Sequence, residues 1–298
     1  MDIPLISILR EHALWLENHA SGRQADLSGM TLNDSKLAGA VLSRAILIGT
    51  TMLDADLSSA DLTGAKLERA DLQRANLAGA DLNGATLTTS DFSGAWLADA
   101  NLSEIIATGA IFKQARFPKA RLMEAAVNDA NFFEASAPGA SFHQSRFYDV
   151  DFRHAKLEEA VFYHARLQHV RFAEILAARA NFTGAKVDHC DFSRAAAART
   201  KFVRAEVTQC EFRYADLREC DFREARLRGG DFGRANMEQC RFGGAQLTMA
   251  DFRGANLDGA RELTSDQLSQ ALTDEATVLP NGKRGPYLRH SGAEKPNR

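Results

Sequence analysis

The sequence predicts an all-β solenoid, in which the chain winds into a stack of similar coils. A five-residue unit repeats without insertion or deletion over residues 25–259. In each unit a small residue and a central Leu or Phe flank one polar residue, as in a short strand, and two mostly polar residues follow. A unit of this size cannot bury its apolar pair alone, so it must stack on its neighbours.

A second period describes the shape of one coil. The central position carries Phe at every tenth residue from Phe132 to Phe252, and most of the centres between them are Leu or Val. This alternation predicts a four-sided coil with aromatic rings on two opposite sides. Gly recurs at the fifth position, for example at Gly64 and Gly184, where a turn with positive φ would suit it.

The pattern resembles the pentapeptide-repeat family, whose motif is a small residue, Asp or Asn, Leu or Phe, and two polar residues. The unit at residues 60–64, Ala-Asp-Leu-Thr-Gly, matches this motif, and the resemblance covers most of the chain. Members of that family form a right-handed quadrilateral parallel β-helix with four units per coil. The resemblance therefore implies about 12 coils, and the segments outside the repeat are expected to add short helical caps at both ends.

Residues 1–24 precede the repeat and are predicted to form an N-terminal helical cap. A first coil exposes its apolar core and an unpaired strand edge, so it needs a cover. We interpret Trp15 as part of this seal. The apolar residues that fall at helical spacing are Ile6, Leu9, Ala13 and Leu16.

Residues 260–282 are predicted to form a C-terminal cap of one helix and one strand. Thr264 and Gln267 match a capping box, which predicts a helix that reaches about Thr273. An extended segment and a Pro-Asn-Gly turn follow, an ending that also resembles bacterial members of the family. Residues 283–298 are basic and polar, and their composition predicts disorder.

Two assembly states are compatible with this short C-terminal cap. Related proteins dimerise end to end through their C-terminal segments, so the resemblance implies a homodimer with a twofold contact. The alternative is a monomer in which the same segment closes the last coil. The residues expected to form the dimer contact or the cap are Leu268, Leu272, Val278 and Leu279.

Composition limits the classes of partner. The net charge is −3 and 25% of the residues are charged, which indicates a soluble protein without a strong attraction to nucleic acid. No apolar run approaches the roughly 20 residues of a membrane-spanning helix, and Asp2 precedes the first apolar run, unlike a signal peptide. We therefore expect a cytoplasmic protein with no direct nucleic-acid partner and no membrane contact.

The four cysteines open their units at the position where Ala usually stands. We expect them to fill small inward-facing spaces as thiols. The alternative is two stacked disulfides, because each pair is separated by one coil, but a reducing cytoplasm disfavours it. No CxxC spacing is present, so no metal or other cofactor is expected. The cysteines are Cys190, Cys210, Cys220 and Cys240.

One cluster of side chains is a candidate partner-binding surface. Residues 20 apart should stack in columns, and a basic, aromatic and histidine-containing cluster then falls in the middle of the repeat. The alternative interpretation is an ordinary solvated surface. His169 would lie over His189, but two imidazoles and one carboxylate are too few to predict a metal site. The cluster consists of Met123, His143, Arg146, Tyr148, Tyr163, His164, Arg166, His169 and Lys186.

The sequence contains no arrangement typical of an active site, such as a nucleophile beside a base or a phosphate-binding loop. A filled β-helix presents ridges rather than pockets, so we expect no enzymatic activity. The leading hypothesis is a non-catalytic protein–protein interaction scaffold that presents charged and aromatic columns on a rigid rod.

The alternative function comes from the family resemblance. Some pentapeptide-repeat proteins bind type II topoisomerases by imitating duplex DNA, which implies a modulator of DNA gyrase or another type II topoisomerase. One predicted column is acidic, but arginines adjoin it and are expected to neutralise it. The acidic column is Asp191, Glu211, Asp231 and Asp251, and the arginines are Arg194, Arg213, Arg234 and Arg253.

Overall fold

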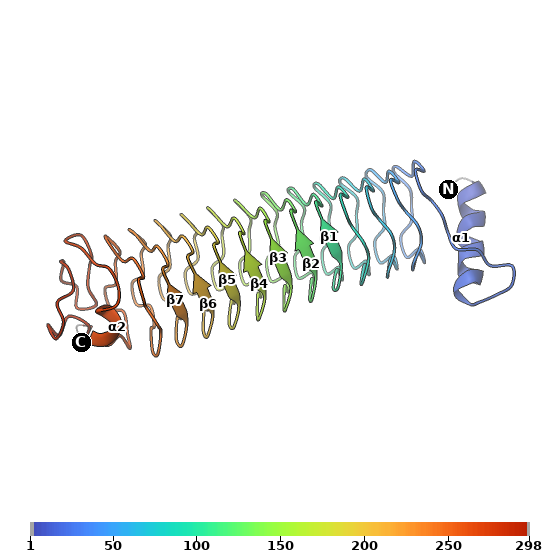
Figure 1. Ribbon diagram of the computed structural model, residues 1–298. Helices are drawn as coiled ribbons and strands as arrows, with labels where there is room; N and C mark the ends of the chain where they lie inside the picture. The colour runs from blue at the N-terminus through green and yellow to red at the C-terminus, as the bar shows by residue number, and fades with distance from the viewer. Residues whose placement is uncertain (1–2, 297–298) are drawn as a thin grey trace. The chain divides into compact units, whose positions relative to one another are not determined.

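A computed structural model describes residues 3–296, and the chain divides into two compact units, Met1–Arg146 and Phe147–Arg298. Each unit contains about six coils of a right-handed quadrilateral parallel β-helix, so the predicted fold class is confirmed. Within each unit the coils follow one another in chain order (Figure 1). No helix in the described part of the chain is long and apolar enough to cross a membrane.

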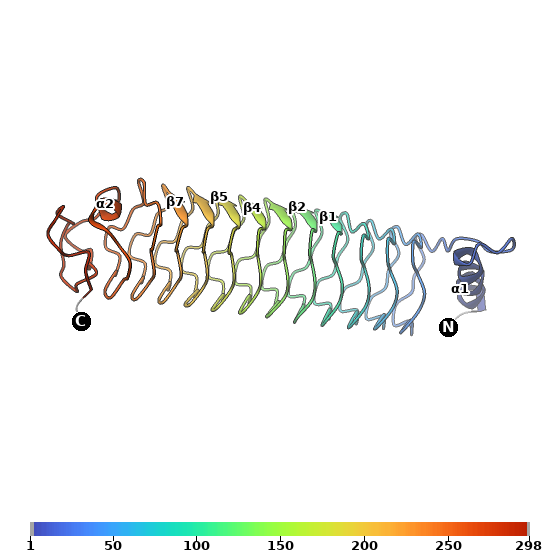
Figure 2. The same cartoon turned by 90° about the horizontal axis from the view of Figure 1, so that it is seen from below.

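Both units are built from the same parallel pairing, in which residue i lies opposite residue i+20. The first unit contains helix α1 (Ile3–Leu16) and the strands β1 (Ile106–Thr108) and β2 (Ala126–Asn128), which pair in parallel. Strand β3 (Arg146–Tyr148) spans the boundary between the units. In the second unit four strands pair in the order β4-β5-β6-β7 and lie along one side of the coils (Figure 2). They are β4 (Arg166–Gln168), β5 (Lys186–Asp188), β6 (Glu206–Thr208) and β7 (Arg226–Arg228), and helix α2 (Ser265–Leu268) follows.

Backbone hydrogen bonds explain why five residues make one side of a coil. The N–H of Leu62 donates to the carbonyl of Asp81 in the next coil at 2.7 Å, and the N–H of Asp61 donates to Ala40 at 2.9 Å. The N–H of Ala65 closes a turn onto the carbonyl of Leu62 at 2.9 Å. The residue inside that turn, Gly64, has φ of 63°. Each side is therefore a short extended piece followed by a corner, as the repeat predicts.

The core consists of the central side chains and is filled by rings in the second unit. Phe222 is buried between Phe202 and Phe242, with ring centroids 5.1 and 5.5 Å away in stacked arrangements. Phe232 meets Phe222 edge-on from another side of the coil at 6.1 Å. These stacked and edge-on geometries are the ones that aromatic pairs prefer. The prediction of rings on two sides of the coil is thereby confirmed.

The small first position also tolerates polar side chains, because they donate hydrogen bonds to backbone carbonyls. Thr200 donates its hydroxyl to the carbonyl of Ala177 at 2.8 Å, and the thiol of Cys220 donates to Ala197 at 3.1 Å. All four cysteines are buried free thiols, as the sequence predicts. Burial raises the pKa of the Cys190 and Cys240 thiols well above the usual range, so these groups are unreactive in the folded protein.

Helix α1 lies at the N-terminal end of the coils of the first unit (Figure 1), but with a different face than the sequence predicts. Leu5 and His12 are buried, whereas Ile6 is 54% exposed. His12 can be buried because its Nδ1 accepts a hydrogen bond from the backbone N–H of Ala25 at 3.0 Å. Trp15 stacks on His12 with ring centroids 5.6 Å apart, consistent with a part in the seal.

The C-terminal segment has the predicted capping box but a shorter helix. The side-chain hydroxyl of Thr264 accepts a hydrogen bond from the backbone N–H of Gln267. The side-chain oxygen of Gln267 in turn accepts one from the backbone N–H of Thr264. Helix α2 ends at Leu268 rather than near Thr273, because Leu272 already re-enters the ladder and donates its N–H to Ala250 at 2.8 Å. Val278 then pairs in parallel with Asn256. The segment therefore closes the last coil of the second unit.

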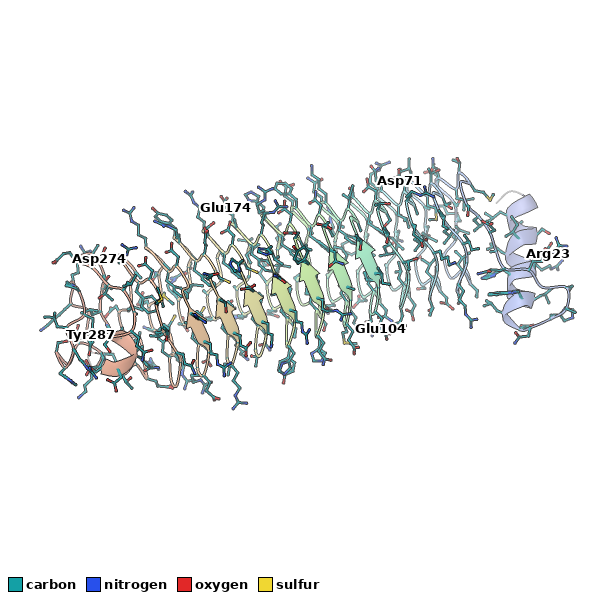
Figure 3. All side chains as sticks on the ribbon, viewed as in Figure 1. Arg23, Asp71, Glu104, Glu174, Asp274 and Tyr287 are labelled. Carbon is teal, nitrogen blue, oxygen red and sulfur yellow. The ribbon has the colours of Figure 1, made fainter. Side chains whose placement is uncertain are left out.

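The prediction of a disordered tail is wrong for residues 283–296; residues 297–298 lie outside the described part of the chain. Tyr287 lies beside α2 (Figure 3), and its hydroxyl is 2.8 Å from the hydroxyl of Ser265. Arg289 forms a 2.7 Å ion pair with Asp266. A polar composition does not exclude order here, because the tail finds hydrogen-bond partners on the cap.

Candidate partner-binding surface

The side of the second unit formed by β4–β7 is called here the strand face. Its strands alternate between outward and inward residues, so Arg166 and Gln168 are exposed while Leu167 is buried. Arg166 lies directly opposite Lys186 on the neighbouring strand. The predicted column of basic side chains therefore exists in the second unit, and strand geometry points it outward.

An aromatic and histidine cluster borders this column. Tyr148 is 44% exposed and meets His169 edge-on, with ring centroids 5.8 Å apart. His169 lies 5.3 Å from the ring of His189, whose Nδ1 is 3.0 Å from Oδ1 of Asp188. The two imidazoles are neighbours one coil apart, as the spacing of 20 predicts, and their rings are tilted by 41°. No group of three His, Cys, Asp or Glu in the described residues is arranged to hold a metal ion.

The corner next to the strand face carries Tyr163 and His164. Tyr163 is 37% exposed, and its ring centroid is 4.2 Å from that of His164. Nδ1 of His164 is 3.3 Å from the carbonyl oxygen of Gly184. A Cβ at residue 184 would approach the His164 ring to 2.5 Å, so the glycine makes room for the imidazole. The position of His164 thus depends on a glycine one coil away.

The structure brings six of the nine predicted residues together in the second unit. The other three, Met123, His143 and Arg146, belong to the first unit. Met123 and Arg146 are exposed there, and His143 is half-buried. The six residues of the second unit are called the basic-aromatic patch below. They are Tyr148, Tyr163, His164, Arg166, His169 and Lys186.

The charge of the strand face is positive. Glu206 is shared between Lys186 at 3.5 Å and Arg226 at 2.9 Å. No ion pair within the described residues involves Arg166 or Arg228. Two carboxylates, Asp188 and Glu206, therefore offset only part of the positive charge of the lysine and the three arginines on this face.

The acidic column of the second unit is partly neutralised. Asp231 pairs with Arg213 at 3.0 Å, and Asp251 pairs with Arg253 at 2.6 Å, a hydrogen-bonded contact that holds the pKa of Asp251 below its usual range. Arg194 and Arg234 do not pair with the column as expected. Their guanidinium carbons instead lie on the ring of Tyr214 at 5.8 and 5.6 Å, since the corner brings the three side chains together.

Sequence reasoning missed a hollow on the strand face. It has a volume of about 480 Å³ and extends over the three coils that follow Lys186 and His189. The sequence did indicate which residues share this column, because Glu206 and Arg226 stand 20 and 40 residues after Lys186. The depth of the hollow could not be predicted from the sequence, because it depends on the conformations of neighbouring side chains. The hollow is lined by Glu206, Thr208, Arg226, Arg228, Gln246, Thr248 and Met249.

Family models match most of the repeat. A model described as pentapeptide repeats (8 copies) matches residues 25–64, 55–94 and 90–123. A model described as a pentapeptide repeat region matches residues 145–222, and one described as pentapeptide repeats (9 copies) matches residues 202–256. No curated protein matches the chain in sequence.

Several solved structures are similar. HetL, a pentapeptide repeat protein involved in heterocyst differentiation regulation from the cyanobacterium Nostoc sp. strain PCC 7120, shares 24% identity over 95% of this chain and 99% of its own, with a TM-score of 0.41. Trypsin-treated QnrB1, a plasmid-mediated fluoroquinolone resistance protein, shares 20% identity over 71% of this chain and 88% of its own, with a TM-score of 0.33. Rfr23, from the cyanobacterium Cyanothece 51142, shares 21% identity over 53% of this chain and 90% of its own, with a TM-score of 0.22.

Proposed function

Because the chain belongs to the pentapeptide-repeat family, we propose that it is a non-catalytic scaffold that binds another protein. The observation that carries this proposal is the basic-aromatic patch. It presents two exposed tyrosines, Tyr148 and Tyr163, beside the paired column of Arg166 and Lys186. Tyrosine and arginine are enriched at protein interfaces and among the residues that dominate binding energy.

The backbone beneath the patch favours binding because it is already ordered. The N–H of Lys186 donates to Ala165, and the N–H of His169 donates to Asp188, so coils on both sides hold these residues. The Tyr148 ring also contacts His169. Binding here would therefore not require the backbone to become ordered, and pre-ordered groups lose less entropy on binding. We propose Met123, His143 and Arg146 of the first unit as separate contact residues.

A capture experiment with matched tyrosine variants tests the scaffold. Proteins retained by the immobilised wild type would be compared with those retained by the Tyr148→Ala, Tyr163→Ala double variant and by Tyr214→Ala. Tyr214 is exposed but lies between arginines on a different side of the coil. We expect the double variant to weaken partner binding at least 10-fold, about 1.4 kcal/mol, and Tyr214→Ala to leave it unchanged.

Two results would contradict this proposal. Equal binding by all three proteins would remove the patch from the interface. If the wild type retains no protein specifically, the scaffold function itself fails.

A DNA-mimicking modulator of a type II topoisomerase is our second candidate. It is supported by the register of the acidic column, in which Asp191, Glu211 and Asp231 stand opposite one another on successive coils. It is weakened by the arginines that pair with Asp231 and Asp251. If purified protein at micromolar concentration inhibits or protects gyrase supercoiling, the topoisomerase modulator would replace the scaffold as the leading function.

We propose that the scaffold acts in the cytoplasm. Its four thiols are free and buried, which suits a reducing compartment. The family's β-solenoid fold is typical of non-catalytic proteins, and the surface offers charged ridges to a protein partner rather than to nucleic acid. Reaction of all four thiols with a thiol reagent only after unfolding would agree with this assignment.

A further inference from the structure

The hollow on the strand face lies beyond the basic-aromatic patch and has a chemistry of its own. Strand β7 presents Arg226 and Arg228 outward on either side of the buried Leu227. Alternate residues of a strand are about 6.6 Å apart, so both guanidinium groups can reach one ligand segment. Arg228 lies opposite Thr208 on β6, and Thr248 belongs to the next coil. The hollow thus combines two cations with hydroxyl groups.

The carboxylate within this hollow does not cancel its positive charge. Glu206 accepts a hydrogen bond from Nη1 of Arg226 at 2.9 Å and also pairs with Lys186 at 3.5 Å. Two cations therefore share one anion. Arg228 has no ion pair within the described residues, so its five N–H donors remain available to a ligand.

An arginine without an ion pair, such as Arg228, favours a carboxylate ligand. The planar guanidinium matches a carboxylate in a two-point contact that a lysine cannot reproduce. The hydroxyl of Thr208 adds a further donor beside it, whereas Thr248 donates its hydroxyl to Oε1 of Gln270 at 3.1 Å. Donors outnumber acceptors in the hollow, which favours a negatively charged group.

The rim of the hollow also offers an apolar contact. Met249 is 67% exposed at the corner of the coil and lines the hollow. Methionine is flexible and polarizable, so it adapts to apolar groups of a partner. Arginine and methionine are both enriched at protein interfaces. A carboxylate at Arg228 next to an apolar side chain at Met249 would satisfy both features.

We infer that the hollow binds an acidic segment of a partner protein, with a Glu or Asp carboxylate on Arg228 and a neighbouring apolar side chain on Met249. This inference rests on the proposed scaffold function and adds the chemical nature of the partner segment. The basic-aromatic patch and the hollow then form two neighbouring contact points on the strand face. Binding should weaken as the salt concentration rises, because the contact is charge-assisted and exposed.

Fluorescence anisotropy of a labelled peptide with alternating Glu and Leu tests this assignment. The full-length protein would be titrated into that peptide and into a matched peptide with Gln in place of Glu. We expect saturable binding of the Glu peptide, at least fivefold weaker binding by Arg228→Gln, and at least fivefold weaker binding of the Gln peptide. Met249→Ser should weaken binding about twofold.

The control is Arg116→Gln, which changes the net charge by the same amount. Arg116 is an exposed arginine of the first unit, and no ion pair within the described residues involves it. Equal weakening by Arg116→Gln and Arg228→Gln would mean that only overall charge matters and would overturn the site. Absence of peptide binding would also overturn the proposed site. If the tyrosine variants nevertheless lose their captured partner in that case, the scaffold function would stand without a role for the hollow.

Discussion

At the residue scale, the fifth position of each unit places the strongest demand on the backbone. Gly64 has φ of 63°, but Arg69 and Thr89 have nearly the same values, 57° and 55°. The four-sided coil therefore imposes the left-handed conformation on whatever residue stands there. Side chains with a Cβ adopt it at a cost of about 1 kcal/mol, which the surrounding ladder of hydrogen bonds must offset.

This cost leads to a prediction at Thr89, where a β-branched residue has positive φ. Thr89→Gly should leave the protein about 1 kcal/mol more stable than Thr88→Gly, because only at residue 89 does glycine relieve steric strain. The measurement is the denaturant midpoint of the wild type and the variant. Thr88→Gly is the matched control, since residue 88 is not among those with positive φ and glycine there only adds unfolded-state entropy. A midpoint for Thr89→Gly no higher than that of Thr88→Gly would show that the corner is not strained.

At the element scale, the repeat was predictable and the ends were not. Every unit of the repeat obeys one rule of spacing, so the pairing of Arg166 with Lys186 followed by simple addition. Helix α1 occurs once, and its hydropathy pattern pointed to Ile6 rather than to His12. A hydropathy pattern treats histidine as polar and therefore as exposed. The imidazole of His12 is nevertheless part of the core, because it accepts a hydrogen bond from the backbone N–H of Ala25. The tail around Tyr287 was missed for the same reason, because its order depends on partners that only the fold brings close.

The same limit applied to the candidate site. The columns of the basic-aromatic patch follow from the period of 20. The hollow beside Arg228 depends on side-chain depth, and no spacing rule contains that information. Arg194 and Arg234 show this as well, since they contact Tyr214 instead of the carboxylates next to them in the sequence pattern.

Helix α1 should be pH-sensitive through His12. Burial lowers the pKa of His12, and the nearby carboxylate of Asp61 only partly opposes this shift. The unfolded state therefore binds the proton more readily, so the contribution of this group to stability is complete above about pH 6.5 and is lost as the pH falls through the lower folded pKa. Protonation of Nδ1 also removes the acceptor for the N–H of Ala25. Amide hydrogen exchange in α1, corrected for intrinsic rates, should accelerate below about pH 6.5.

Two variants separate this effect from general acid destabilisation. His12→Gln should make exchange in α1 independent of pH over the same range. His19→Gln, at an exposed histidine whose side chain hydrogen-bonds to Ser21, should behave like the wild type. If both variants retain the wild-type pH dependence, His12 is not the responsible group.

At the scale of the whole molecule, the open question is whether the C-terminal segment makes a dimer or only a cap. Leu268 and Leu279 are buried within their own chain, while Leu272 is exposed and Val278 is half-buried. A twofold contact of all four residues would require the segment to open. We therefore propose a monomer in which residues 260–282 close the last coil.

Truncation after residue 259 distinguishes these states. The truncated chain would expose the apolar end of its last coil and an unpaired strand edge, so it should aggregate. The intact protein should have the mass of one chain at tens of micromolar by light scattering. A twofold mass for the intact protein, lost on truncation to a soluble monomer, would instead establish the C-terminal dimer.

The register of 20 residues has a consequence for how this surface can change in evolution. Duplicating one full coil would leave every later side chain in its column and simply move it one step along. Deleting a single five-residue unit would turn all later residues onto the next side of the coil, and it would also set the later Phe positions over the Leu and Val positions of the preceding coil. A loss of that kind between Lys186 and Arg226 would place Arg228 on a different side of the coil from the basic-aromatic patch. Binding specificity in this chain is therefore exposed to a class of small mutation, the loss of one five-residue unit.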